Sequence, residues 1–217
     1  MMPSTTREMT RLIAATLDEL RDVGSEGLTV DRIARRAGLP LDLVARLYPE
    51  MSTLLQDAVD QAVEDTIVRA IDDLPDGLPA SARLGLFCHR LWAALRLPVM
   101  ASLYRLAHVE HDRVGTFERL LGDIVLLRAR AVVREMVAEA DAAGEIEVAD
   151  GDRKADRIVT LLFAHGFWHH YPELFRLFAA EPQDSVVPHI LLVTLGSDAR
   201  TRIMAAARGI SLEERRR

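Results

Sequence analysis

Residues 28–50, "LTVDRIARRAGLPLDLVARLYPE", decide the fold of this 217-residue chain. Thr29 stands where a helix N-cap is expected, and apolar residues then recur at helical spacing up to Ala37. Gly38 can adopt the left-handed conformation that ends a helix, and a second short helical pattern follows from Pro40. The stretch therefore predicts two short helices joined by a tight turn, as in a helix-turn-helix.

Helical patterns continue on both sides of this stretch, and no strand-like alternation competes with them. A fourth helix is expected over residues 52–72, ending before the segment "DDLPDGLP", whose prolines and glycine mark a break. Long apolar patterns then follow at 116–143, 155–178 and 185–195. An apolar stripe precedes the stretch and stops at Gly24; it consists of Met9, Leu12, Ile13, Leu17 and Leu20.

The chain is expected to be all-α and to have two domains. Residues 1–57 would form a three-helix, helix-turn-helix domain, in which Leu39, Val44 and Leu47 of the third helix point inward. Residues 58–217 would form an antiparallel helical domain for ligand binding and dimerisation, with the helix over 52–72 linking the two.

Composition limits the classes of function. The chain is 49% hydrophobic and carries a net charge of −6, which argues against a general polyanion binder. Residues 1–57 hold seven arginines and nine acidic residues, so any DNA binding must depend on where the arginines lie. Cys88 is the single cysteine, which excludes an intramolecular disulfide. Without a leader-like segment or an apolar run of membrane-spanning length, a cytoplasmic protein with no membrane association is expected.

The order of these features resembles the N-terminal domain of the TetR family of bacterial transcriptional regulators, over residues 7 to about 60. Three positions depart from the family pattern: Ala45 is usually tyrosine, Asp42 often glycine, and Met51 often lysine. The resemblance implies a homodimeric regulator, a repressor, that binds a palindromic double-stranded DNA operator and is released by a small-molecule effector. The matching residues are Leu28-Thr29, Ile33-Ala34, Ala37-Gly38, Tyr48, Pro49 and Leu54.

Several residues of the two short helices could contact DNA. Arg46 is the strong donor of the second helix, and Asp42 can accept a hydrogen bond from a cytosine amino group. Apolar side chains there could contact thymine methyl groups, although core packing is the alternative for Leu41 and Leu43, and a favourable helix-dipole charge the alternative for Asp42. The full predicted set is Thr29, Arg35, Arg36, Pro40, Leu41, Asp42, Leu43, Arg46 and Tyr48.

The C-terminal region is rich in aromatic residues that suit an apolar ligand pocket between helices, although ordinary core packing is the alternative for each. The patterns at 155–178 and 185–195 carry more apolar surface than one helix face needs, which favours pairing of two chains there. The predicted pocket residues are Phe87, Leu91, Trp92, Tyr104, His108, Phe117, Leu121, Phe163, Phe167 and Trp168.

The histidines raise the alternative of a metal site. His165 and His169 are four residues apart, and His108 and His111 are three apart, so each pair can share a helix face. Neither pair completes a ligand set, and the aromatic-rich surroundings of His165 favour a pocket-lining or hydrogen-bonded core residue over a metal ligand. No metal, cofactor or enzymatic activity is therefore expected. Two alternatives stay open: a protein of this fold that binds small molecules or partners without an operator, and a metal-dependent enzyme.

Overall fold

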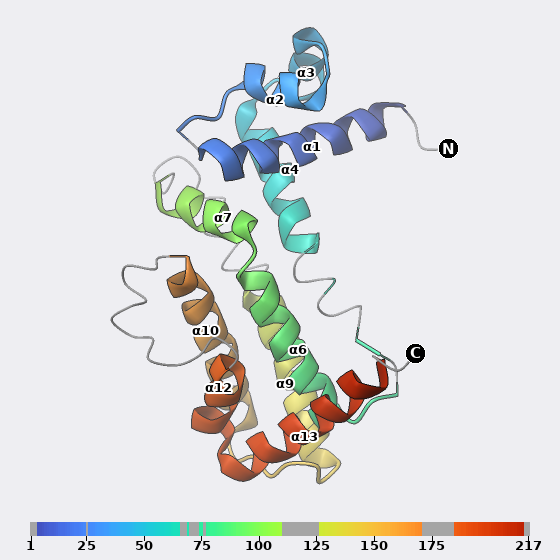
Figure 1. Ribbon diagram of the computed structural model, residues 1–217, viewed down its shortest axis with the longest axis vertical. Helices are drawn as coiled ribbons and strands as arrows, with labels where there is room; N and C mark the ends of the chain where they lie inside the picture. Colours follow the sequence, from blue (N-terminus) through green and yellow to red (C-terminus); the bar gives the residue numbers. More distant parts are fainter. Residues whose placement is uncertain are drawn as a thin grey trace. The chain divides into compact units, whose positions relative to one another are not determined.

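The computed structural model describes residues 4–24, 26–65, 69, 74–75, 77–109, 126–170 and 185–214. Every long regular element in these segments is a helix, which confirms the all-α prediction (Figure 1). The chain forms two compact units. The N-terminal unit comprises residues 1–65 and 97–121, and the C-terminal unit comprises residues 66–96 and 122–217.

In the N-terminal unit, α1 packs against α2, α4 and α7, and α2 packs against α3. Their shared core is built from large side chains that exclude water, and these include Leu12 of α1, Ile33 of α2 and Leu54 of α4. Val44 secures α3 to this core, with Leu39 and Leu47 partly buried beside it, as the sequence predicts. The helices of this unit are α1 (Ser4–Val23), α2 (Val30–Ala37), α3 (Leu41–Leu47), α4 (Met51–Val63) and α7 (Pro98–Val109).

The helix ends in this unit follow the local signals in the sequence. The first helix stops before Gly24, which has a φ of 72°, a conformation that costs glycine little. The fourth helix begins at Met51, one residue before the expected start. Residues 66–68 and 70–73 lie outside the described segments, so the end of this helix at residue 72 stays a prediction. The domain boundary at residue 57 likewise stays a prediction.

In the C-terminal unit, α6 lies against α9, α10, α12 and α13. The core along α6 includes Leu84, Phe87 and Leu91, none of which has measurable exposure. Burial of this much apolar surface is the main source of stability for such a unit. The helices are α6 (Ala80–Leu95), α9 (Leu127–Ala142), α10 (Gly151–His169), α12 (Val186–Leu195) and α13 (Ser197–Glu214).

Two glycines let helices of the C-terminal unit approach closely. A Cβ on Gly85 of α6 would lie 3.0 Å from side-chain atoms of both Ala207 and Ile203 of α13. A Cβ on Gly166 of α10 would lie 2.8 Å from the Cβ of Leu95 in α6. Both helix contacts therefore depend on the absence of a side chain.

The structure extends the predicted helix pattern in two places. Helix α10 begins at Gly151, earlier than the expected residue 155, and α13 forms a separate final helix that the named apolar patterns did not include. The buried residues of α13 are mainly small, as at Ala199 and Ala207, so its apolar periodicity is weak. Residues 116–125 and 171–178 of the predicted patterns lie outside the described segments. Among the described helices, none combines the length and apolarity needed to cross a bilayer.

Candidate DNA-binding surface

Helix α2 is fixed at both ends by its own sequence. Thr29 has extended backbone angles and its Oγ1 accepts a hydrogen bond of 3.4 Å from the backbone N–H of Arg32, which confirms the predicted N-cap. At the other end Gly38 is left-handed, with φ 62° and ψ 40°. The amides of Gly38 and Leu39 donate to the carbonyls of Arg35 and Ala34, the pattern of a Schellman motif.

A side chain of α1 adds to this helix end. The Arg11 guanidinium donates from Nη2 to the carbonyl oxygens of Ala37 and, at 3.4 Å, Gly38. These carbonyls belong to the turn that leads into α3, and a cation near a helix C-terminus is favourable. Arg11 therefore ties the first helix to the turn before α3. Its role was missed because it stands more than 20 residues before this turn in the chain.

Helix α3 presents a mixed surface to solvent. Pro40 is its N-cap, and the Pro40 carbonyl accepts hydrogen bonds from Leu43 N and Val44 N. Val44 is only 1% exposed and holds the helix against the core, whereas Leu41 is 47% exposed. At this exposure Leu41 lies outside the core, so core packing does not account for its position. The predicted DNA-contacting residues Asp42 and Arg46 are also exposed, while Leu43 is half-buried.

No side chain in the described part of the chain holds Arg46. Across the described segments of the chain, it makes neither a hydrogen bond nor an ion pair. Its helical position, one turn after Asp42, puts both charged side chains on the same exposed face of α3. The guanidinium is consequently available to a phosphate or to a base edge.

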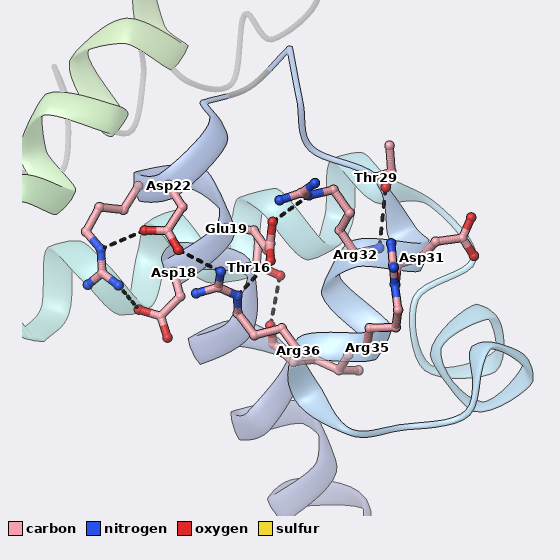
Figure 2. Close-up of polar contacts among 11 residues, drawn as sticks. Thr16, Asp18, Glu19, Asp22, Thr29, Asp31, Arg32, Arg35 and Arg36 are labelled. Atoms are coloured by element: carbon pink, nitrogen blue, oxygen red, sulfur yellow. Dashed lines mark hydrogen bonds and ion pairs between the residues drawn. The ribbon is translucent and has the colours of Figure 1, made fainter.

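The arginines of α2 fall into two groups. Figure 2 shows Arg32 and Arg36 directed toward carboxylates of α1, while Arg35 and Thr29 lie together on the other side of α2. Arg35 is exposed, and its Nε donates to the backbone carbonyl of Asp31 at 3.3 Å. Arg35 and Thr29 thus keep the exposed positions that a contact with phosphate requires.

Glu19 of α1 is the centre of the other group. Its Oε2 accepts from Arg32 Nε at 2.7 Å, and its Oε1 accepts from Arg36 Nε at 2.7 Å. Asp22, one turn later, accepts from Arg36 Nη2 at 2.6 Å. The Arg32 hydrogen bond, with that of Arg36, holds the pKa of Glu19 below its ordinary value despite burial. The Arg36 hydrogen bond likewise lowers the pKa of Asp22.

Two members of the predicted DNA-contacting set are engaged within the N-terminal unit. Arg36 is engaged by two carboxylates of α1, Glu19 and Asp22. Tyr48 is 5% exposed and belongs to the core, and its hydroxyl donates to Asp57 Oδ2 at 2.8 Å. Burial, together with Asp57, raises the pKa of Tyr48. DNA contact stays a prediction for the whole set; the members without such partners are Thr29, Arg35, Pro40, Leu41, Asp42, Leu43 and Arg46.

Some of the predicted pocket residues are core residues of the C-terminal unit. Phe87 and Leu91 have no exposure and Trp92 has 4%, whereas Phe163, Phe167 and Trp168 are half-buried. Tyr104 is half-buried in the N-terminal unit, and the side chain of His108, together with Phe117 and Leu121, lies outside the described residues. The pocket as a whole therefore stays a prediction.

The histidines of α10 surround Trp92. The Trp92 ring meets His165 and His169 edge to face, with ring centroids 6.5 Å and 6.2 Å apart. The Arg96 guanidinium lies 5.6 Å from the Trp92 ring centroid. Burial, followed by the charges of His170 and Arg96, lowers the pKa of His169. Within the described segments, no three His, Cys, Asp or Glu side chains are grouped so that they could hold a metal ion.

Comparisons with known proteins agree with this arrangement. No protein-family model matches the chain. The chain is 30% identical over 148 residues to the HTH-type transcriptional regulator BetI of Klebsiella pneumoniae, covering 60% of this chain and 72% of that protein.

Solved structures share the fold over nearly the whole chain. A TetR-family transcriptional regulator from Marinobacter aquaeolei has a TM-score of 0.68 at 14% identity, covering 96% of this chain and 98% of that one. The transcriptional regulator FadR from Bacillus subtilis, in complex with stearoyl-CoA, has a TM-score of 0.63 at 16% identity, covering 87% and 98%. With a capped helix-turn-helix that exposes Arg46 and Leu41, a helical C-terminal unit and these relatives, the chain belongs to the TetR family of transcriptional regulators.

Proposed function

We propose that this protein is a repressor that binds a palindromic DNA operator as a homodimer in the cytoplasm and is released by a small molecule. The observation that carries the proposal is the exposed face of α3, where Arg46 has no partner among the described residues and Leu41 is 47% exposed. Such a face can place a cation on a phosphate or base and an apolar side chain on a thymine methyl group.

The surrounding residues support a shared mode of contact. Thr29 caps the start of α2, where free backbone amides can bind phosphate oxygens. Arg35 lies on the exposed side of the same helix, where its guanidinium can also bind phosphate. Pro40, Asp42 and Leu43 complete the leading end of α3, which in helix-turn-helix proteins enters the major groove. With few free cations on this surface, the proposed affinity is modest and depends on sequence more than on general charge.

Dimerisation is proposed through the last helices of the chain. On α12, Leu192 is 37% exposed and Val193 is 50% exposed, an apolar pair next to α13 in the same unit. Two-fold pairing would place two recognition helices about one DNA turn apart, roughly 34 Å, which explains a palindromic operator.

The effector is proposed to bind in the C-terminal unit. FadR, which shares this fold, carries stearoyl-CoA in its solved structure, and the half-buried aromatic residues Phe163, Phe167 and Trp168 suit an apolar ligand here. Release from DNA requires that the effector bind one conformation of the dimer more tightly than the other.

The test is selection of DNA by the purified protein from a pool of random and genomic fragments at two salt concentrations. Enrichment of a palindrome, with an affinity that falls as salt rises, is expected. Absence of any enriched sequence at low salt would overturn the repressor proposal. It would favour the second candidate, a small-molecule or partner-binding protein of the same fold. The pairing of Arg32 and Arg36 with Glu19 also supports this candidate, because it leaves fewer cations for DNA.

A further inference from the structure

Two of the three arginines on α2, Arg32 and Arg36, donate hydrogen bonds to carboxylates of α1. Glu19 is 4% exposed and uses both carboxylate oxygens, one for Arg32 Nε and one for Arg36 Nε, each at 2.7 Å. Arg36 also donates to Asp22 at 2.6 Å. Arg32 and Arg36 themselves are 40% and 32% exposed in their side chains, so they lie at the surface although their partner is buried.

The burial of Glu19 decides which partner the arginines keep. A carboxylate removed from water is strongly disfavoured unless cations and hydrogen bonds compensate it. If Arg32 and Arg36 both turned to DNA phosphates, Glu19 would be left charged and without these donors. A phosphate contact at the surface is screened by water and salt, so it stabilises an arginine less than the ion pair with buried Glu19 does.

We propose that Glu19, assisted by Asp22, restrains Arg32 and Arg36 from DNA phosphates and thereby limits the sequence-independent part of DNA binding. The inference rests on the proposed DNA-binding function and assigns a positioning role to an acidic side chain on α1. DNA recognition would then depend mainly on Arg35, Arg46 and the face of α3. Specificity gains from this, because general phosphate attraction carries no sequence information.

The salt dependence of binding measures the restraint directly. For duplex DNA the slope of log affinity against log salt steepens by about 0.9 for each phosphate that a protein neutralises. The probe is a fluorescein-labelled 24-base-pair duplex of random sequence, titrated with full-length protein at several KCl concentrations from 50 to 300 mM. The Glu19→Gln variant keeps the side-chain volume and removes the charge. We expect it to bind this duplex more tightly at low salt, with a slope steeper by up to about 1.8 per protomer.

The Asp18→Asn variant is the matched control. Asp18 lies on the same helix and loses the same charge, but it pairs with Arg21 of its own helix at 2.9 Å. It reports the effect of one less negative charge without release of an α2 arginine. The Asp22→Asn variant is a second test that leaves the buried Glu19 in place, and it should steepen the slope by less than half as much as Glu19→Gln, because Glu19 still holds Arg36. Circular dichroism and thermal unfolding verify that each variant is folded.

A double variant separates release of the arginines from a general charge effect. In the wild-type background Arg36→Met should leave the salt slope unchanged, because Arg36 is already held by α1. In the Glu19→Gln background the same substitution should remove about 0.9 of the added slope. A slope that falls on Arg36→Met in the wild-type background would overturn the inference, since Arg36 would then already contact phosphate.

The outcomes also distinguish this inference from the proposed function. If the wild type selects an operator but folded Glu19→Gln has the slope of Asp18→Asn, the restraint is wrong and the repressor proposal stands. If the wild type selects no operator while Glu19→Gln gains a steep slope, the restraint is supported and the repressor proposal fails. If the wild type selects no operator and neither protein binds the duplex at 50 mM KCl, both are overturned.

Discussion

The Tyr48 hydroxyl donates a hydrogen bond of 2.8 Å to Asp57 Oδ2, which joins the residue that ends α3 to the middle of α4. Tyr48 is 5% exposed, so its ring also packs in the core of the N-terminal unit. The contact fixes the C-terminal end of α3 to α4 on the core side of the helix. Tyr48 itself does not lie on the exposed face of α3. Stability and DNA binding should therefore respond differently to changes at Tyr48 and at Arg46.

Replacing Tyr48 with phenylalanine should lower the free energy of unfolding by about 0.5–1.5 kcal/mol, because Asp57 loses its donor while the ring stays. Urea unfolding at pH 7 measures this change. The salt slope of DNA binding should match that of the wild type, since no phosphate contact is removed. A slope reduced by about 0.9 would instead place the hydroxyl on the DNA backbone and confirm the original prediction for Tyr48.

Replacing Arg46 with alanine should weaken binding to the selected operator by about 1–3 kcal/mol, because α3 loses the cation that has no partner among the described residues. Fluorescence anisotropy with the operator duplex gives the affinity, and light scattering checks that the oligomeric state is unchanged. Arg157→Ala is the matched control, because Arg157 is an exposed arginine of α10 in the other unit. Equal affinity of the Arg46→Ala variant and the wild type would remove Arg46 from the DNA-binding surface.

Replacing Gly166 with alanine should lower the free energy of unfolding by about 1–3 kcal/mol, because the added Cβ would lie 2.8 Å from the Cβ of Leu95. The better helix propensity of alanine offsets about 1 kcal/mol at most. Gly85→Ala should cost less, since its nearest side-chain atoms, on Ala207 and Ile203, lie at 3.0 Å. Thermal and urea unfolding compare the two variants, and the opposite order of stability would contradict this account of the helix contacts.

The stability of the wild type should fall in acid more steeply than that of Glu19→Gln. Hydrogen bonds from Arg32 and Arg36 hold the pKa of Glu19 below its ordinary value in the folded chain. As the pH falls, the unfolded chain therefore takes up the proton first, near pH 4.3. The stabilisation by Glu19 is complete above that pH and is lost as the pH falls through the lower, folded pKa.

Urea unfolding at intervals from pH 7 to pH 3 tests this dependence. At pH 7 the Glu19→Gln variant should be less stable than the wild type, by about 1–3 kcal/mol for two lost charge-assisted hydrogen bonds. The difference should shrink toward pH 3. Parallel curves over the whole range would show that the Glu19 carboxylate has the same pKa in both states.

Much of the N-terminal architecture was predictable because its signals are local. A Thr29 hydroxyl caps the helix that follows within three residues, and Gly38 ends that helix through its own backbone freedom. Helical spacing placed Val44 inward on α3, and the structure confirms this. These features depend on neighbours in the chain, so the sequence alone carries the fold class and the family.

Only the tertiary structure decided which arginines of α2 are paired with carboxylates and which stay exposed. Arg35 and Arg36 have the same predicted role in the sequence, yet Glu19, which stands 17 residues before Arg36, engages Arg36 and not Arg35. The inward position of Tyr48 and the contact of α6 with α13 are likewise set by how helices cross. Periodicity and caps fix where a helix begins, ends and turns its apolar face. Which charges meet depends on packing between helices, and that geometry arises only when the cores form.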